Sequence, residues 1–335
     1  RITTAPPRLL EVTEPSRRFE RQPDLGARLA RLRGAAAAAQ VVHAVDRVTL
    51  GVARGEVLGL VGESGCGKST LARMIAGVME PTSGRIVYEG IDVTDRAGAA
   101  AKQVALKIQM IFQDPLASLN PRMRIGEIVG EAPLVHGLVE RQSLSSFLDA
   151  LLERVGLDPD CKSRYPHQFS GGQRQRIGVA RALAVNPDFI VCDEAVSALD
   201  VSIRAQVLNL FMDLRASLGL TYLFISHDLG VIEHVSDRIA IMYLGRIVEL
   251  ADAEAFFRAP NHPYAVALLE EVPRLDARGS SYRPIRGEIP SPLAPPSGCH
   301  FHPRCPHAMP RCKVEPPQLR TIAPGRLSAC HLNDG

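Results

Sequence analysis

The sequence predicts an α/β protein built on a parallel β-sheet with helices on both of its faces. Four short apolar runs have the length and composition of buried strands, at residues 57–61, 189–192, 222–225 and 239–243. Segments with helical periodicity separate these runs along the chain. Because parallel strands need long crossover connections, strands that alternate with helices favour a doubly wound sheet.

A glycine-rich loop directly follows the first run and opens into a helical pattern at residues 71–76. It fits the spacing G-x-x-x-x-G-K-[ST], whose glycines let the backbone curl and point successive N–H groups at a phosphate. Lys68 supplies a cation for the β- and γ-phosphates, and the Ser69 hydroxyl suits Mg²⁺. A chance glycine turn is the plain alternative, but the flanking strand and helix argue against it. We therefore predict a nucleoside triphosphate site at this phosphate loop (residues 62–70), formed by Gly62, Glu63, Ser64, Gly65, Cys66, Gly67, Lys68, Ser69 and Thr70.

Two adjacent carboxylates, Asp193 and Glu194, follow the second apolar run. At the end of a buried strand, such a pair can place one carboxylate on Mg²⁺ and the other beside the γ-phosphate. We assign the metal to Asp193. Glu194 is then suited to orient or deprotonate an attacking water. The alternative is a helix N-cap with incidental acids.

Three further polar elements fit the same site. Gln113 ends a strand, where its amide can ligate Mg²⁺ and sense the γ-phosphate, and His227 follows another strand and can hydrogen-bond the same group. A third element opens a helix and offers free N–H groups as a second anion cradle. Its residues are Ser170, Gly171, Gly172 and Gln173. Taken singly, the three would be a surface glutamine, a structural histidine and a helix cap.

Composition limits the classes of function. Apolar residues make up 46% and charged residues 22% of the 335 residues, as in an ordinary globular protein. A net charge of +3 and the absence of tryptophan give no support to a nucleic-acid partner. The sequence has no apolar stretch of membrane-spanning length and no signal peptide, although it begins with Arg1 rather than Met. We therefore expect a chain that does not itself cross a membrane.

The chain divides into three parts. We expect an irregular N-terminal arm over residues 1–40, whose arginines are either solvated or in contact with phosphates or acidic lipids. Residues 120–168 have mainly helical periodicity. Beyond residue 260 the composition shifts to Pro, Gly, Ser and Arg, which predicts a boundary there and a C-terminal extension over residues 261–335.

In their order along the chain, these motifs resemble the ATP-binding cassette (ABC) ATPases. The resemblance covers about residues 41–260 and matches Walker A (residues 62–69), the Q-loop (Gln113), the signature motif (residues 170–173), Walker B (residues 189–193), the catalytic base (Glu194), the D-loop (Asp200) and the switch histidine (His227). It implies a P-loop NTPase core with a parallel sheet, an antiparallel β part and a helical subdomain at about residues 114–180. It also implies a head-to-tail dimer, in which residues 170–173 of one subunit cover ATP on the other.

Two positions depart from that family pattern. Phe169 stands before the signature serine in place of the commoner leucine, which is a tolerable apolar exchange. The family usually stacks adenine on an aromatic residue upstream of Walker A, but residues 35–40 here are alanines and a glutamine. His43 is the nearest ring, so the adenine platform is not assigned.

Four of the seven cysteines lie close together near the C-terminus, at Cys299, Cys305, Cys312 and Cys330. From spacing alone, four thiolates suit a [4Fe–4S] cluster or a Zn²⁺ ion equally well. Residues 262–264, 287–292 and 296–306, together with 112–123 and 165–167, resemble the oligopeptide/dipeptide importer ATPases, particularly their F-type subunit. In that subfamily the extension carries an iron–sulfur cluster. We therefore expect a [4Fe–4S] cluster on these cysteines, with Zn²⁺ or unligated thiols as the alternatives.

The resemblance also implies a function. We expect the ATP-hydrolysing motor subunit of a peptide importer, at the cytoplasmic face of the cell membrane. Its expected partners are a homologous ATPase in a heterodimer, two transmembrane permease subunits and an extracellular peptide-binding protein. The alternatives are a soluble cassette ATPase of translation or DNA repair, and an importer ATPase for nickel or another small solute.

Overall fold

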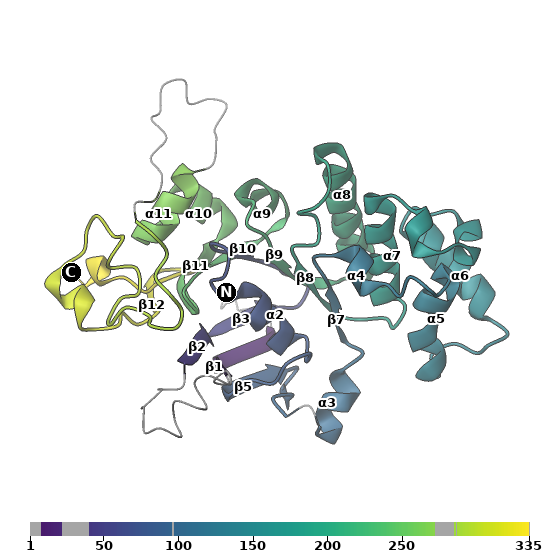
Figure 1. The fold of residues 1–335 in the computed structure, drawn as a ribbon, viewed down its shortest axis with the longest axis horizontal. Helices are drawn as coiled ribbons and strands as arrows, with labels where there is room; N and C mark the ends of the chain where they lie inside the picture. The colour runs from purple at the N-terminus through teal and green to yellow at the C-terminus, as the bar shows by residue number, and fades with distance from the viewer. Residues whose placement is uncertain (1–7, 22–39, 96, 272–284, 286, 335) are drawn as a thin grey trace, which may run out of the picture.

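The computed structural model describes residues 8–21, 40–95, 97–271, 285 and 287–334 (Figure 1). An eight-stranded sheet runs through the middle of the molecule, and its strands from β10 to β7 pair in parallel. At its other edge β11, β13 and β12 are antiparallel. The predicted parallel sheet is therefore confirmed. Across the sheet the strands are β12 (Arg320–Ala323), β13 (Arg326–Ser328), β11 (Arg246–Asp252), β10 (Arg238–Tyr243), β4 (Val57–Val61), β9 (Thr221–Ile225), β8 (Phe189–Asp193) and β7 (Ile108–Ile111).

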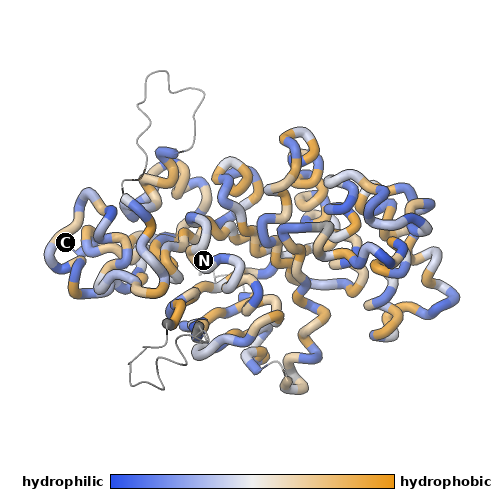
Figure 2. Tube along the Cα trace, viewed as in Figure 1, coloured by the Kyte–Doolittle hydropathy of each residue, from blue (hydrophilic) through white to orange (hydrophobic). Residues whose placement is uncertain are grey.

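The central strands are buried on both faces, as their continuous apolar sequences require. Successive residues of β9 enter different cores because side chains alternate across a strand. Tyr222 and Phe224 pack with Phe211 of the helical side, at ring-centroid distances of 5.7 Å each. Leu223 and Ile225 face the opposite core. The trace coloured by hydropathy is accordingly orange through the middle of the molecule (Figure 2).

Helices cover both faces of this sheet (Figure 1). α2 and α3 lie on one side, next to the antiparallel strands, and α8 to α11 lie on the other. α4 to α7 form a helical subdomain beyond β7 and β8. The bounds are α2 (Lys68–Ile75), α3 (Ala99–Val104), α4 (Pro115–Ser118), α5 (Ile125–Val135), α6 (Leu144–Arg154), α7 (Gly171–Leu183), α8 (Val201–Leu218), α9 (Leu229–Val235), α10 (Ala253–Arg258) and α11 (Pro263–Glu270), with 3₁₀ turns η1 (Pro159–Ser163), η2 (Pro166–Gln168), η3 (Pro310–Lys313) and η4 (His331–Asn333).

The N-terminal segment differs from the expected irregular arm. Residues Arg8–Arg21 form β1, which is paired with β3 and β5 and, at its far end, with β2. Leu10 and Val12 are fully buried, so the strand closes the core beneath α2 in spite of its arginines. The remaining expected arm, residues 1–7 and 22–39, lies outside the described residues. The other strands of this antiparallel sheet are β2 (Gln40–Val45), β3 (Leu50–Ala53), β5 (Ser83–Tyr88) and β6 (Ile91–Asp92).

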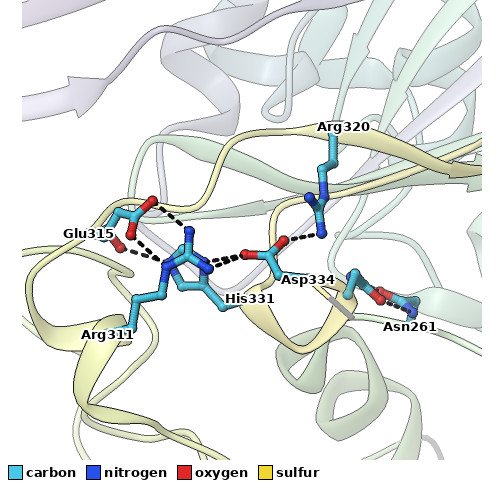
Figure 3. Close-up of polar contacts among 7 residues, drawn as sticks. Asn261, Arg311, Glu315, Arg320, His331 and Asp334 are labelled. Atoms are coloured by element: carbon cyan, nitrogen blue, oxygen red, sulfur yellow. Dashed lines mark hydrogen bonds and ion pairs between the residues drawn. The ribbon is translucent and has the colours of Figure 1, made fainter.

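The C-terminal extension is attached to the central sheet, because β13 pairs with β11. Its end is fastened by the ion-pair network in Figure 3. Arg311 makes two bonds to Glu315, at 2.5 and 2.7 Å, and one to Asp334 at 2.7 Å. Asp334 also pairs with Arg320 and with His331. The boundary expected near residue 260 is therefore not a break in the sheet.

No helix in the described part of the chain combines the length and the apolar character needed to cross a membrane.

Candidate functional site

Most of the predicted site residues gather at one edge of the central sheet. The phosphate loop follows β4 and Glu194 follows β8 directly. Gln113 and His227 are the second residues after the ends of β7 and β9. These four strands are parallel neighbours in the order β4-β9-β8-β7. Their carboxyl ends therefore meet at the edge where ligands bind in open α/β sheets.

The backbone of the phosphate loop depends on its glycines. Gly67 has φ = 107°, in the left-handed region, and a Cβ at this position would overlap the carbonyl oxygen of Ala44. A Cβ at Gly62 would overlap the carbonyl oxygen of Met242. Side chains at either position would push the loop away from β2 and β10. The loop leads directly into α2, and the N–H groups in the first turn of a helix have no partner within the helix and suit an anion.

Lys68 is buried and its ammonium lies within the curve of the loop. Nζ donates to the carbonyl oxygens of Gly62 and Glu63, at 2.7 and 3.0 Å. Cys66 is buried beside it, and burial raises the pKa of its thiol. Ser64 and Gly65 are exposed at the tip of the loop, and Ser69 and Thr70 are half-buried in the first turn of α2.

The Ser69 hydroxyl donates to Oδ1 of Asp193 at 2.9 Å. The structure thus brings together two of the three predicted Mg²⁺ ligands, from α2 and from the end of β8. Asp193 is 3% exposed, and this burial raises the pKa of its carboxyl, against the opposing effect of the Ser69 hydrogen bond. A buried carboxylate oxygen beside a hydroxyl is a donor set that fits a hard divalent cation.

Glu194, at the end of β8, contacts Gln113 and His227, which follow the ends of β7 and β9. Its Oε2 accepts from Nε2 of Gln113 at 3.0 Å and lies 3.4 Å from Nδ1 of His227. The glutamate has φ = 48°, a left-handed conformation that turns its side chain out of the strand direction. The His227 side chain is 59% exposed, whereas that of Glu194 is 17% exposed. The carboxylate therefore lies inside the site and the imidazole at its opening.

The second anion cradle lies elsewhere in the chain. Ser170 caps α7: its hydroxyl accepts from the Gln173 amide nitrogen at 3.3 Å, and the Gln173 side chain accepts from the Ser170 nitrogen at 3.1 Å. Gly172 packs against Ile203, where a Cβ would not fit. Ser170, Gly171, Gln173 and Asp200 are exposed. In Figure 1 the helix α7 lies within the helical subdomain, apart from α2. Gly171 lines a pocket together with Gln113, so the start of α7 borders the group around Glu194.

Two contacts to the phosphate loop were missed by sequence reasoning. Arg304 pairs with the Glu63 carboxylate, and the Tyr264 hydroxyl accepts from the Glu63 backbone nitrogen at 2.9 Å. Both residues come from the C-terminal extension. Arg304 stands next to Cys305, within the group of cysteines whose spacing predicts a metal site. No local sequence pattern indicates that Arg304 pairs with Glu63.

The expected [4Fe–4S] cluster on Cys299, Cys305, Cys312 and Cys330, and its Zn²⁺ alternative, are corrected by the structure. Among the residues described, no group of three or more His, Cys, Asp or Glu side chains is arranged to hold a metal ion. The four cysteines line a common cavity of only about 10 Å³, which is about the space of one water. Burial raises the pKa of Cys299 to about 11, which favours neutral thiols. We interpret the four side chains as packing groups.

Comparisons with known proteins agree with this geometry. Residues 45–197 match the model of the family described as "ABC transporter", and residues 248–312 match "Oligopeptide/dipeptide transporter, C-terminal region". The chain is 52% identical, over 299 residues, to the putative oligopeptide transport ATP-binding protein YkfD of Bacillus subtilis, covering 88% of this chain and 90% of that protein. It is 50% identical to the oligopeptide transport ATP-binding protein AppF of the same organism, with 87% and 90% covered.

Solved structures give the same fold. The ATP-binding cassette MJ0796, in a dimeric post-hydrolysis state bound to ADP and Pi, superposes with a TM-score of 0.62 at 25% sequence identity. The match covers 73% of this chain and 98% of that one. The cbiO1 protein of Clostridium perfringens superposes with a TM-score of 0.60 at 23% identity, over 75% of this chain and 91% of its own, and supports the fold alone.

Proposed function

This chain belongs to the ABC transporter family and, we propose, is the ATPase subunit that drives the import of oligopeptides or dipeptides through a membrane transporter. The observation that carries the proposal is the relationship to oligopeptide transport ATP-binding proteins, which extends over nearly the whole of both chains. The match of the extension to the oligopeptide/dipeptide transporter C-terminal region points to the same cargo. An ATPase of translation or DNA repair has no comparable support.

The phosphate loop grips the polyphosphate of ATP. Its curled backbone and the first turn of α2 offer N–H groups, and Lys68 adds a buried cation held by two loop carbonyls. Ser69 and Asp193 already lie in contact, and with Gln113 they would hold Mg²⁺. When bound, the metal neutralises charge on the β- and γ-phosphates. The fit is supported by the chemistry of the donor set: a hydroxyl, a buried carboxylate and an amide oxygen.

Glu194 acts as the general base for the attacking water. Its carboxylate is held by the Gln113 amide, which turns it toward the end of the sheet where the γ-phosphate of the loop-bound nucleotide would lie. His227 stands at the opening of this group and supplies a hydrogen bond to the γ-phosphate. A carboxylate fixed by neighbouring strands needs little reorganisation when the water arrives.

The exposed residues 170–173 and Asp200 act on a second subunit. Ser170, Gly171 and Gln173 at the start of α7 are exposed, so this helix start is accessible to ATP bound to a partner ATPase. The Ser170 and Gln173 N–H groups are held by their mutual capping bonds, which orient this end of the helix. The related cassette MJ0796 is dimeric in its ADP-bound state. We propose a heterodimer with a homologous ATPase, seated on two permease subunits at the cytoplasmic face of the membrane and supplied by an extracellular peptide-binding protein.

The test is reconstitution with the permease subunits, the partner ATPase and the binding protein in lipid vesicles. We expect ATP hydrolysis to rise when the binding protein is loaded with a di- or oligopeptide, and labelled peptide to accumulate inside. Stimulation by Ni²⁺ but by none of the peptides would reassign the cargo. Failure of the complete assembly to hydrolyse MgATP would overturn the proposal as a whole.

A further inference from the structure

The phosphate loop is held by residues of the C-terminal extension. Nη1 and Nη2 of Arg304 donate to the two carboxylate oxygens of Glu63, at 2.7 and 3.0 Å. The pair joins residues 241 positions apart in the chain. The Arg304 side chain is 4% exposed and that of Glu63 is 19% exposed. A two-point bond between a guanidinium and a carboxylate in such a position fixes direction as well as distance.

The same loop residue is held a second time, by its backbone. The Glu63 N–H donates to the hydroxyl of Tyr264 in α11 at 2.9 Å. Tyr264 is fully buried and packs against Tyr243 and Phe301, with ring centroids 4.6 and 5.3 Å away. Burial, as the main cause, raises the pKa of Tyr264, so the hydroxyl stays neutral. Side chain and backbone of Glu63 are thus both fixed by residues that follow residue 260.

The contacts of Glu63 also affect the position of the Lys68 ammonium. The carbonyl oxygen of Glu63 accepts from Nζ of Lys68, so any shift of Glu63 also shifts the ammonium that meets the phosphates. The Glu63 carboxylate is moreover a negative charge within a loop that must receive a polyanion. Arg304 balances this charge in a partly buried place, where solvent screens it weakly.

We propose that Arg304 is a positioning residue for nucleotide binding, through which the C-terminal extension holds the phosphate loop in shape and cancels the charge of Glu63. The inference rests on the proposed ATP site. The extension is then part of the nucleotide-binding unit. Substitutions near residue 304 should lower the affinity of the phosphate loop for nucleotide, although the two segments are far apart in the sequence.

The test compares Arg304→Ala, Glu63→Gln and the double variant, with MgATP affinity and steady-state kinetics as readouts. Arg304→Ala leaves the Glu63 carboxylate unbalanced, and we expect the Kd and KM for MgATP to rise about tenfold while kcat at saturating ATP changes less than about twofold. Glu63→Gln alone removes the repelling charge together with the carboxylate that accepts the Arg304 fork, and its affinity is the reference for the double variant. The double variant should recover most of the loss, which a merely structural role of the arginine would not predict.

Two controls keep the result interpretable. Arg311→Ala removes an arginine of the same extension that also forks onto a carboxylate, Glu315, and it should leave MgATP affinity unchanged (Figure 3). Arg304→Lys keeps the charge but not the fork, and should retain an intermediate affinity if Arg304→Ala does not fold. The inference is overturned if Arg304→Ala binds MgATP like the wild type, or if the double variant stays as weak as the single one. A wild-type chain that binds no MgATP would instead contradict the proposed function.

Discussion

The phosphate loop and the C-terminal extension are built in opposite ways. The loop is nine consecutive residues that leave a buried strand and run into the first turn of a helix, and its shape comes from backbone conformation, with Gly67 in the left-handed region. The extension has little regular structure and is fastened by side chains, through ion pairs at Asp334 and an aromatic group at Tyr264 and Phe301. One added atom can therefore distort the whole phosphate loop, whereas a single substitution in the extension removes only the contacts of one side chain.

The two regions meet at Glu63, where the extension holds the loop. Substitutions in the loop should therefore remove nucleotide binding altogether, and substitutions in the extension should weaken it in steps. The expected effect on nucleotide binding is therefore largest for Gly67 in the loop and smallest for the cysteines of the extension.

Gly67→Ala should have the largest effect. The new Cβ would overlap the Ala44 carbonyl oxygen at a backbone conformation that suits glycine, so the loop must move. We expect the loss of detectable MgATP binding by calorimetry. Gly178→Ala is the matched control, because a Cβ there meets nothing within 4 Å and the residue lies inside α7. Equal binding by Gly67→Ala and the wild type would contradict the geometry of the loop.

Glu194→Gln should abolish turnover without abolishing binding. Removing a general base lowers kcat by about 10²- to 10⁴-fold, whereas the amide can still accept from Gln113. Single-turnover hydrolysis and equilibrium binding, measured on the same preparation, separate the two effects. Glu233→Gln, an exposed change on α9, serves as the control. Brisk hydrolysis by Glu194→Gln would assign the base to another group.

Tyr264→Phe should have a moderate effect. It leaves the Glu63 N–H without its acceptor in a buried place, which costs about 1–3 kcal/mol. We expect a lower unfolding free energy and a weaker MgATP affinity, both measured by titration. Tyr222→Phe is the matched control, since the buried Tyr222 hydroxyl has no hydrogen-bond partner within the described part of the chain. If both variants behave alike, the Tyr264 contact does not hold the loop.

The sequence predicted the parts of the site that are continuous along the chain. The residues from Gly62 to Thr70, and the pair Asp193 and Glu194, reveal themselves because each stands directly after an apolar strand. Their convergence with Gln113 and His227 follows from the parallel order of four strands, which alternation with helices indicates. The periodicity of apolar residues and the spacing of motif residues are local properties of the sequence, so they are sufficient to predict these parts of the site.

The rest depends on contacts between distant segments. Arg304 meets Glu63 only because the extension folds back on the sheet through β13 and β11. β1 was overlooked because arginines and glutamates surround the buried Leu10 and Val12, and a bulge interrupts the strand's alternation. The cysteine spacing suited a metal site. Whether the side chains converge on an ion, however, depends on the folded chain, and among the residues described no three His, Cys, Asp or Glu side chains do so.

Cys299→Ser should have the smallest effect, a change in the free energy of unfolding that is visible only at alkaline pH. Burial, and next the neighbouring thiols, raise the pKa of Cys299 in the folded chain from the ordinary 9.0 to about 11. A raised pKa means that the neutral thiol is favoured by folding. Its contribution to stability is therefore complete below about pH 9 and is lost as the pH rises toward about 11.

We expect the unfolding free energy of the wild type to fall more steeply between pH 9 and about 11 than that of Cys299→Ser, measured by denaturant titration. MgATP affinity at neutral pH should be the same in both, because packing thiols of the extension do not touch the phosphate loop's charges. Parallel stability curves would show that Cys299 titrates as it would in the unfolded chain. The packing role assigned to Cys299 would then be wrong, since desolvation of a thiol must raise its pKa.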